Sequence, residues 1–192
     1  MAKITIRDLE FRVTSARLEA FFDAPPRTSP GAHRLAWGVV VETTSAGAKF
    51  DWEPRFTAER LFETKPLEVP SFRDLNGRQG SWGDDGEIAF LYTFTHESVV
   101  NARWKVILSA SGRLVFALNG FSNFDHEGGL VGLLPVSVET ELAFAPIPCG
   151  SRAERECRAR LSRFGIKDRF DFRVVDGVSE LVPIDYPNNG AI

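Results

Sequence analysis

Apolar residues recur at every second position along most of this chain, and this alternation constrains its fold more than any other feature. It is clearest over 35–41, where Leu, Trp, Val and Val alternate with other residues, and again over 100–108. Successive side chains of a β-strand point to opposite faces of a sheet, so the alternation indicates strands with one buried face. The chain is therefore predicted to be mainly β.

The alternation also locates the individual strands. It predicts strands over 4–6, 9–13 and 18–22, 33–41 with a resumption at Phe50 and Trp52, 88–94, 100–108 paired with 114–118, and 136–144. The parity changes near Ser15, as a β-bulge would require. Segment 56–62 fits either a strand or a helical turn. From Leu67 to Gly86, prolines and glycines interrupt the pattern, so we expect the longest loop there.

The C-terminal part combines a helix with a hairpin. Ser151 and Glu154 have the spacing of a capping box, which predicts one helix over about 151–165. Asp176-Gly177 is the signal of a type I′ turn and predicts a terminal hairpin over about 168–184. We expect a single mostly-β domain over 1–192, either an antiparallel β-sandwich or an open barrel, with this one C-terminal helix and the terminal hairpin.

Composition and charge narrow the class of protein. The net charge of −3 and the hydrophobic fraction of 43% predict a soluble globular protein without general affinity for nucleic acid or membranes. The N-terminus lacks the apolar stretch of a secretion signal, which favours a cytoplasmic location. Cys149 and Cys157 are too few for a disulfide framework and are expected to be reduced thiols.

Motifs for metal, cofactor or covalent chemistry are weak. His96-Glu97 and the segment Asp125-His126-Glu127 contain ligand types for a transition metal, but the pattern of two histidines one residue apart followed by a glutamate is absent. No serine lies in a G-x-S-x-G elbow, and no glycine-rich phosphate loop is present. We therefore assign no catalytic residue, no metal ligand and no cofactor.

The glycine-rich segment 73–87 gives the strongest candidate for recognition. It places Trp82 among glycines and charges of both signs, which is typical of an anchor residue for a protein partner. We predict a partner-binding patch of Arg78, Trp82, Asp84 and Asp85. If Trp82 is an exposed anchor, Trp82→Ala should change stability by less than about 1 kcal/mol, whereas Trp104→Ala should cost about 3–5 kcal/mol as a core deletion.

These observations favour a non-catalytic protein-binding module, of the kind found in bacterial immunity and inhibitor proteins. One alternative is a carbohydrate- or small-ligand-binding β-sandwich that uses Trp52 and Trp82 as stacking platforms, with Trp37 and Trp104 in the core. A second alternative is an enzyme whose site is assembled from distant strands, with His33, His96 and His126 as candidate bases.

Overall fold

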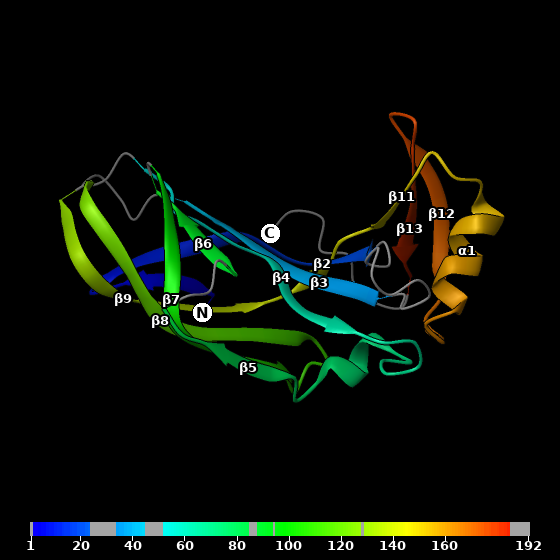
Figure 1. Cartoon of the computed structure of the whole chain (residues 1–192), viewed down its shortest axis with the longest axis horizontal. Helices are drawn as coiled ribbons and strands as arrows, with labels where there is room; N and C mark the ends of the chain where they lie inside the picture. The colour runs from blue at the N-terminus through cyan, green and yellow to red at the C-terminus, as the bar shows by residue number, and fades with distance from the viewer. Residues whose placement is uncertain are drawn as a thin grey trace.

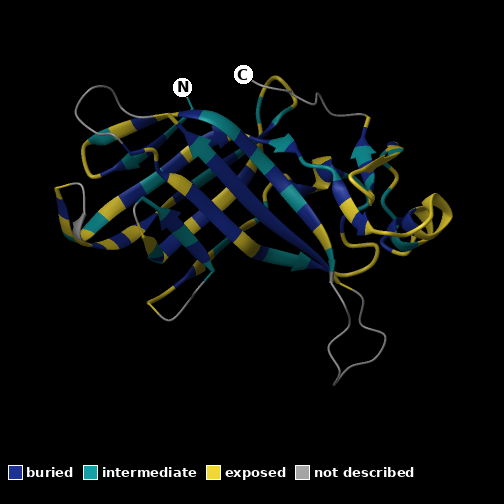
Figure 2. Cartoon of the chain, turned by 90° about the horizontal axis from the view of Figure 1, so that it is seen from above, coloured by how far each residue is buried: buried dark blue, intermediate teal, exposed yellow. Residues whose placement is uncertain are grey.

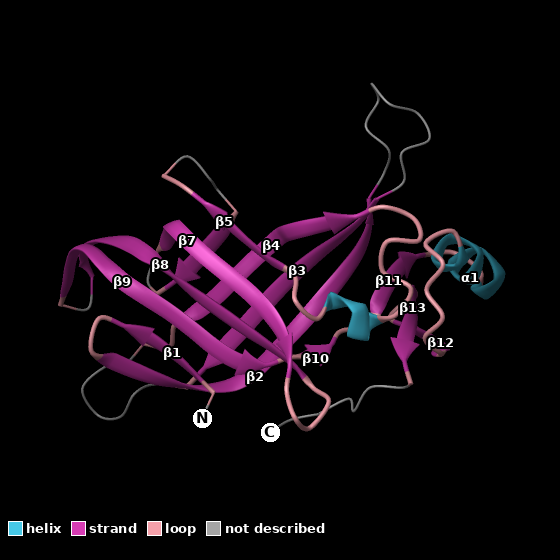
Figure 3. Cartoon of the chain, turned by 90° about the horizontal axis from the view of Figure 1, so that it is seen from below, coloured by secondary structure: helices cyan, strands magenta, loops and turns pink. Residues whose placement is uncertain are grey.

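The chain folds into a closed antiparallel β-barrel with a small C-terminal sheet at one end (Figures 1 and 3). We describe a computed structural model, over residues 2–23, 34–44, 52–84, 88–93, 95–127 and 129–184. The barrel strands are β1 (Lys3–Ile6), β2 (Leu9–Asp23), β3 (Arg34–Thr43), β4 (Arg55–Thr64), β6 (Ala89–Tyr92), β7 (His96–Leu108), β8 (Leu114–Glu127) and β9 (Leu130–Glu141). Each pairs with the next along the chain, and β1 also pairs with β9. The expected β-rich fold is confirmed, but the sheet is a closed barrel rather than a sandwich.

Shorter elements surround this ring of strands. Strand β5 (Gln79–Trp82) pairs with β7, and β10 (Ala143–Phe144) lies parallel to β2. A 3₁₀ helix, η1 (Phe72–Leu75), precedes β5. The C-terminal sheet has the order β11 (Ile147–Gly150), β13 (Val178–Pro183) and β12 (Phe170–Val175), and is accompanied by α1 (Glu154–Ser162). Thus β5 extends the outer surface of the barrel beside β7.

Large side chains pack the barrel interior. Figure 2 shows the buried residues along the barrel strands. The largest fully buried side chains include Trp37, Phe11, Phe56, Phe116 and Phe124. Phe56 and Phe116 come from opposite parts of the ring, and their ring centroids lie 5.8 Å apart. An eight-stranded barrel is just wide enough for side chains to fill it or for one small ligand. Here aromatic residues fill the described interior, so a binding site is expected on the outer face of the barrel.

The C-terminal sheet is attached to the barrel end through Phe72 of η1. This ring stacks on Phe144 at 4.4 Å and meets Phe170 of β12 edge-on at 5.7 Å. Asp168 accepts hydrogen bonds from the Ser71 hydroxyl at 2.9 Å and from the Phe72 backbone N–H at 2.8 Å. One continuous cluster of buried side chains therefore joins the barrel to the C-terminal sheet.

Several local predictions are confirmed. The β2–β3 register shifts between Val13 and Ser15, where the parity change indicated a bulge. The hairpin of β7 and β8 forms, and Asp176 and Gly177 both have positive φ (50° and 79°), as a type I′ turn requires. Segment 56–62, left open between strand and helix, is part of β4.

Other local predictions are wrong. Trp52 precedes β4, which begins at Arg55, and Phe50 lies outside the described residues. The expected long loop at 67–86 contains η1 and β5. The helix begins at Glu154 after Ala153, whose side chain makes no capping hydrogen bond, so the Ser151 capping box does not form. Ser151 lies too far before the first helical residue to reach its free N–H groups.

Candidate functional site

A row of polar side chains crosses the outer face of the barrel from β5 to β1. The strand registers place Ser81 beside Arg103, Arg103 beside Asn119, Asn119 beside Ser137, and Ser137 beside Thr5. The neighbours of these residues along each strand, such as Ala102, Leu118 and Val138, are buried in the barrel. The alternation that fills the core therefore also aligns this row outside it.

Two adjacent hollows in the surface follow this row. The first, of about 520 Å³, is lined by Thr5, Arg7, Asn101, Arg103, Asn119, Gly120, Phe121, Pro135, Val136 and Ser137. The second, of about 460 Å³, is lined by Gln79, Gly80, Ser81, Arg103, Trp104, Lys105, Ala117 and Asn119. Arg103 and Asn119 line both hollows. We call the two hollows together the barrel groove.

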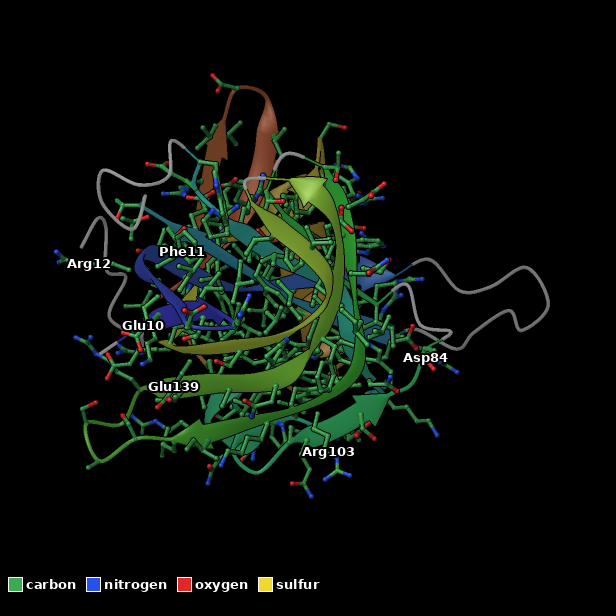
Figure 4. The ribbon with its side chains drawn as sticks, turned by 90° about the vertical axis from the view of Figure 1, so that its left-hand side faces the viewer. Glu10, Phe11, Arg12, Asp84, Arg103 and Glu139 are labelled. Atoms are coloured by element: carbon green, nitrogen blue, oxygen red, sulfur yellow. The ribbon has the colours of Figure 1, made fainter. Side chains whose placement is uncertain are left out.

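The barrel groove is cationic, although the chain as a whole carries a net charge of −3. Arg7, Arg103 and Lys105 line it, and no aspartate or glutamate does. Arg103 and Lys105 are exposed, and in the described part of the chain no carboxylate forms an ion pair with either. Figure 4 shows Arg103 on the outer side of the barrel wall. These two cations are available to an external anion.

Lys3, next to the barrel groove, has carboxylates beside it. It forms an ion pair with Glu10 of β2, and the β1–β9 register places it beside Glu139. Glu10 and Glu139 lie on the outer surface of the same barrel end as Arg103 (Figure 4). Lys3 therefore differs from Arg103 and Lys105, which have no ion pair in the described structure.

Exposed apolar side chains continue the barrel groove toward the β8–β9 turn. Phe121 lines the first hollow and is 39% exposed, and it pairs in register with Pro135. Leu133 and Val131 follow on the outer face of β9 and are 56% and 53% exposed. Clustered exposed apolar residues mark interaction surfaces more often than scattered ones do. The face thus combines free cations with an apolar end.

The backbone of β7 has an irregularity at the edge of the barrel groove. Asn101 has a positive φ of 49°, and the β7–β8 register shifts between Val100 and Arg103. The Asn101 backbone N–H donates to the Gly83 carbonyl at 3.1 Å, and the Asn101 side-chain amide donates to Asp84. A bulge re-aims the following side chains. Asn101 therefore fixes the end of β5 against β7 beside Arg103.

Trp82 does not occupy the exposed position predicted for it. It lies in β5, is 9% exposed, and its indole N–H donates to the Val99 carbonyl at 2.6 Å. The prediction of an exposed loop residue is therefore wrong, because pairing of β5 with β7 turns Trp82 toward the core. Its burial gives it a packing role.

Of the other three predicted partner-binding residues, Arg78 and Asp84 each have a partner within the protein. Arg78 donates to Glu68 at 2.7 Å. The pKa of the Glu68 carboxyl is lowered, first by the hydrogen bond from the Lys65 backbone N–H and then by Arg78. Asp84 is exposed and accepts from Asn101, and Asp85 lies outside the described residues.

Tryptophan platforms and metal ligands are also not found in the described structure. Trp52 is 5% exposed and Trp82 9%, so neither offers a ring to a sugar, and Trp37 and Trp104 are core residues as predicted. The described residues contain no group of three or more histidine, cysteine, aspartate or glutamate side chains able to hold a metal.

Of the three candidate bases, His33 and the side chain of His126 lie outside the described residues. His96 is exposed, and its ring lies 4.2 Å from Tyr92.

Both cysteines are free thiols, and both are buried. Burial, and to a lesser extent the neighbouring Cys157, raises the pKa of the Cys149 thiol to about 12. A thiol with a raised pKa is a poor nucleophile because the reactive form is the thiolate. Neither cysteine extends the barrel groove, which lies on other strands.

The sequence contains the polar face of β7, but local alternation does not mark it as a site. Asn101, Arg103 and Lys105 occupy alternate positions of a strong strand, and Ser137 and Glu139 do the same in a later one. The signal that marks a site is the pairing of these strands through β8, which local periodicity does not contain.

In the part of the chain that is described, none of the helices has the length and apolar character needed to cross a membrane. In comparisons with known proteins, no protein-family model, no curated protein and no solved structure matches this chain.

Proposed function

We propose that this protein is a non-catalytic protein-binding module and that its partner docks on the barrel groove. The observation that carries the proposal is the position of Arg103 and Lys105, two exposed cations without a carboxylate partner in the described structure. Arg103 also shares the first hollow with the exposed Phe121. Arginine and aromatic residues are enriched in the energetically important parts of protein interfaces.

The charge of the barrel groove indicates the chemistry of the partner. An acidic side chain between Arg103 and Lys105 would gain charge-assisted hydrogen bonds without disturbing an existing ion pair. An apolar side chain beside it would cover Phe121 and Leu133 and remove them from water. We therefore expect a partner surface with one or more carboxylates next to an apolar residue.

We further propose that the protein is cytoplasmic and that it is of the immunity or inhibitor type. Two free, buried cysteines fit a reducing compartment. A rigid barrel whose core is filled with aromatic residues would present its outer face without rearrangement, which lowers the entropic cost of association.

A small anionic ligand is the second candidate, because each hollow lies in the size range of small-molecule sites. Carboxylate or phosphate groups would bind Arg103 by paired hydrogen bonds. This candidate replaces the tryptophan platforms of the sugar-binding hypothesis with cationic contacts. It predicts saturable binding of a small anion in the absence of any protein partner.

The test compares three baits in a pull-down from the native cell lysate, read by mass spectrometry. They are the wild type, the groove variant Arg103→Glu/Lys105→Glu, and the control variant Arg73→Glu/Arg155→Glu. The control changes two exposed cations outside the barrel groove and matches the change in net charge. Circular dichroism and thermal melting establish that all three are folded.

We expect one stoichiometric protein on the wild type and the control but not on the groove variant. Its affinity should fall with added salt, because exposed charges are screened. Retention of the same protein by all three baits would reject the barrel groove as the docking face. Binding of inorganic phosphate or citrate by the wild type alone, with no protein retained, would favour the small-ligand candidate.

A further inference from the structure

Strand β12 forms one edge of the C-terminal sheet. The sheet order is β11, β13, β12, so one side of β12 pairs with β13, and among the described residues no strand lies beside the other. The β12–β13 hairpin extends beyond the neighbouring elements (Figure 4). Open edges with unpaired backbone groups are templates for pairing with another chain, and proteins normally protect them with prolines, bulges or charges of one sign.

The two edges of this sheet differ in that protection. At the opposite edge, β11 contains Pro148, and its register with β13 shifts between Pro148 and Gly150. In contrast, β12 (Phe170–Val175) contains no proline, and its register with β13 is continuous over all six residues. The β12 edge is regular and suited to pairing.

The hairpin geometry fixes which backbone groups of β12 point outward. Val175 and Val178 close the two-residue turn and form a hydrogen-bonded pair, and such pairs alternate along an antiparallel ladder. The outward N–H and C=O groups therefore belong to Phe170, Phe172 and Val174. Among the described residues, Phe172 and Val174 make no backbone hydrogen bond outside the sheet.

The charges on β12 select one way for two copies to pair. Antiparallel pairing centred on Phe172 uses the outward backbone groups and places Asp171 of each copy opposite Arg173 of the other. Pairing centred on Asp171 or on Arg173 would place like charges opposite each other, which is unfavourable. Arg173 already donates to one carboxylate, that of Glu180, at 2.9 Å, so a second carboxylate would complete a charge network.

The same register also buries apolar surface. Val174 is 58% exposed, and it would lie opposite Phe170 of the second copy, while the half-buried Phe172 would lie beside its own symmetry mate. Val175 and Val178, 43% and 40% exposed, lie on the other face of the hairpin tip, near the Asp171–Arg173 contacts. Charge, backbone direction and apolar exposure thus agree on one occupant of the edge.

We propose that two copies of this chain dimerise through antiparallel pairing of their β12 strands centred on Phe172, which joins their C-terminal sheets into one continuous six-stranded sheet. The dimer is isologous, as a two-fold axis requires. It uses elements different from those of the barrel groove, so the two proposals are independent.

The experiment is sedimentation velocity over a range of protein concentrations on the wild type, Asp171→Arg, Arg173→Asp and the double exchange Asp171→Arg/Arg173→Asp. Each single change places like charges opposite each other twice in the dimer. We expect each to weaken the dimer at least about tenfold, from two cross-strand pairs that change from attraction to repulsion. The double exchange restores opposite charges and should restore dimerisation.

A backbone variant tests the pairing independently of charge. Val174→Pro removes an outward N–H while it leaves the hairpin's own hydrogen bonds in place, so the protein should remain folded and become monomeric. Arg155→Asp, an exposed change on α1, is the control and should dimerise as the wild type does. A wild type that is monomeric at every concentration would overturn the proposal, as would single charge variants that dimerise as tightly as the wild type.

Discussion

Trp82 gives the sharpest test of the structure, because burial and exposure predict opposite results for its removal. An exposed anchor could be deleted with a loss of less than about 1 kcal/mol. In the structure, Trp82 is 9% exposed and its indole N–H donates to the Val99 carbonyl at 2.6 Å. Both the ring and its hydrogen bond are therefore lost in Trp82→Ala.

The loss of stability expected for Trp82→Ala can be divided between the buried ring and its hydrogen bond. Removal of a buried tryptophan side chain costs about 3–5 kcal/mol through lost transfer free energy and the cavity left behind. Trp82→Phe keeps most of the ring but leaves the Val99 carbonyl without this donor, which costs about 1–3 kcal/mol. Trp104→Phe is the matched control: this residue is also buried and stacks on Phe62, but its indole makes no hydrogen bond in the described structure.

Urea unfolding followed by circular dichroism measures the three free energies of unfolding. We expect the midpoint to fall most in Trp82→Ala, with Trp82→Phe less stable than Trp104→Phe, and with slopes close to that of the wild type. A free energy of unfolding for Trp82→Ala within about 1 kcal/mol of the wild type would refute the burial of Trp82 and the pairing of β5 with β7.

Three further predictions concern close packing, the thiols and the barrel end. Gly80→Ala should lower the free energy of unfolding by about 1–3 kcal/mol, because its Cβ would lie 2.8 Å from the Trp104 indole nitrogen; urea unfolding measures this. The Cys149 pKa of about 12 means that the folded state keeps a proton that the unfolded state loses above pH 9.0. The free energy of unfolding should therefore fall as the pH rises above 9.0. This fall should be smaller in Cys149→Ala. The same thiol should react with a maleimide only on unfolding. Asp168→Ala removes the acceptor of the Ser71 hydroxyl and should cost about 2 kcal/mol in thermal melting.

Local features of the fold could be predicted because the residues that determine them are adjacent in the sequence. Alternation identifies strands, a parity change identifies the bulge near Ser15, and Asp176-Gly177 identifies a tight turn. Closure of the barrel depends instead on β1 pairing with β9, for example Ile4 beside Val138. Strands of a sandwich and of a barrel show the same alternation, so this pairing cannot be predicted from periodicity.

The error at Trp82 has a specific physical origin. Residues 79–82 alternate between outward and inward positions, but the inward position before Trp82 is Gly80. A glycine is needed there because the Trp104 indole occupies the space that a Cβ would take. In the sequence, a glycine in a run of turn-forming residues indicates a loop. Gly80, which makes room for Trp104, therefore prevents the sequence from indicating the strand that buries Trp82.

The barrel groove could be predicted only in part for a related reason. The outward residues of each strand are evident from the alternation, and Arg103 and Lys105 were visible on the polar face of β7. Their availability to a partner depends on the neighbouring strands, because a carboxylate at 117 or 119 of β8 would have neutralised them, and the chain has alanine and asparagine there. Whether charged side chains are free to bind a partner depends on the side chains beside them on the neighbouring strands. The barrel groove can be identified only when the order and register of the strands are known.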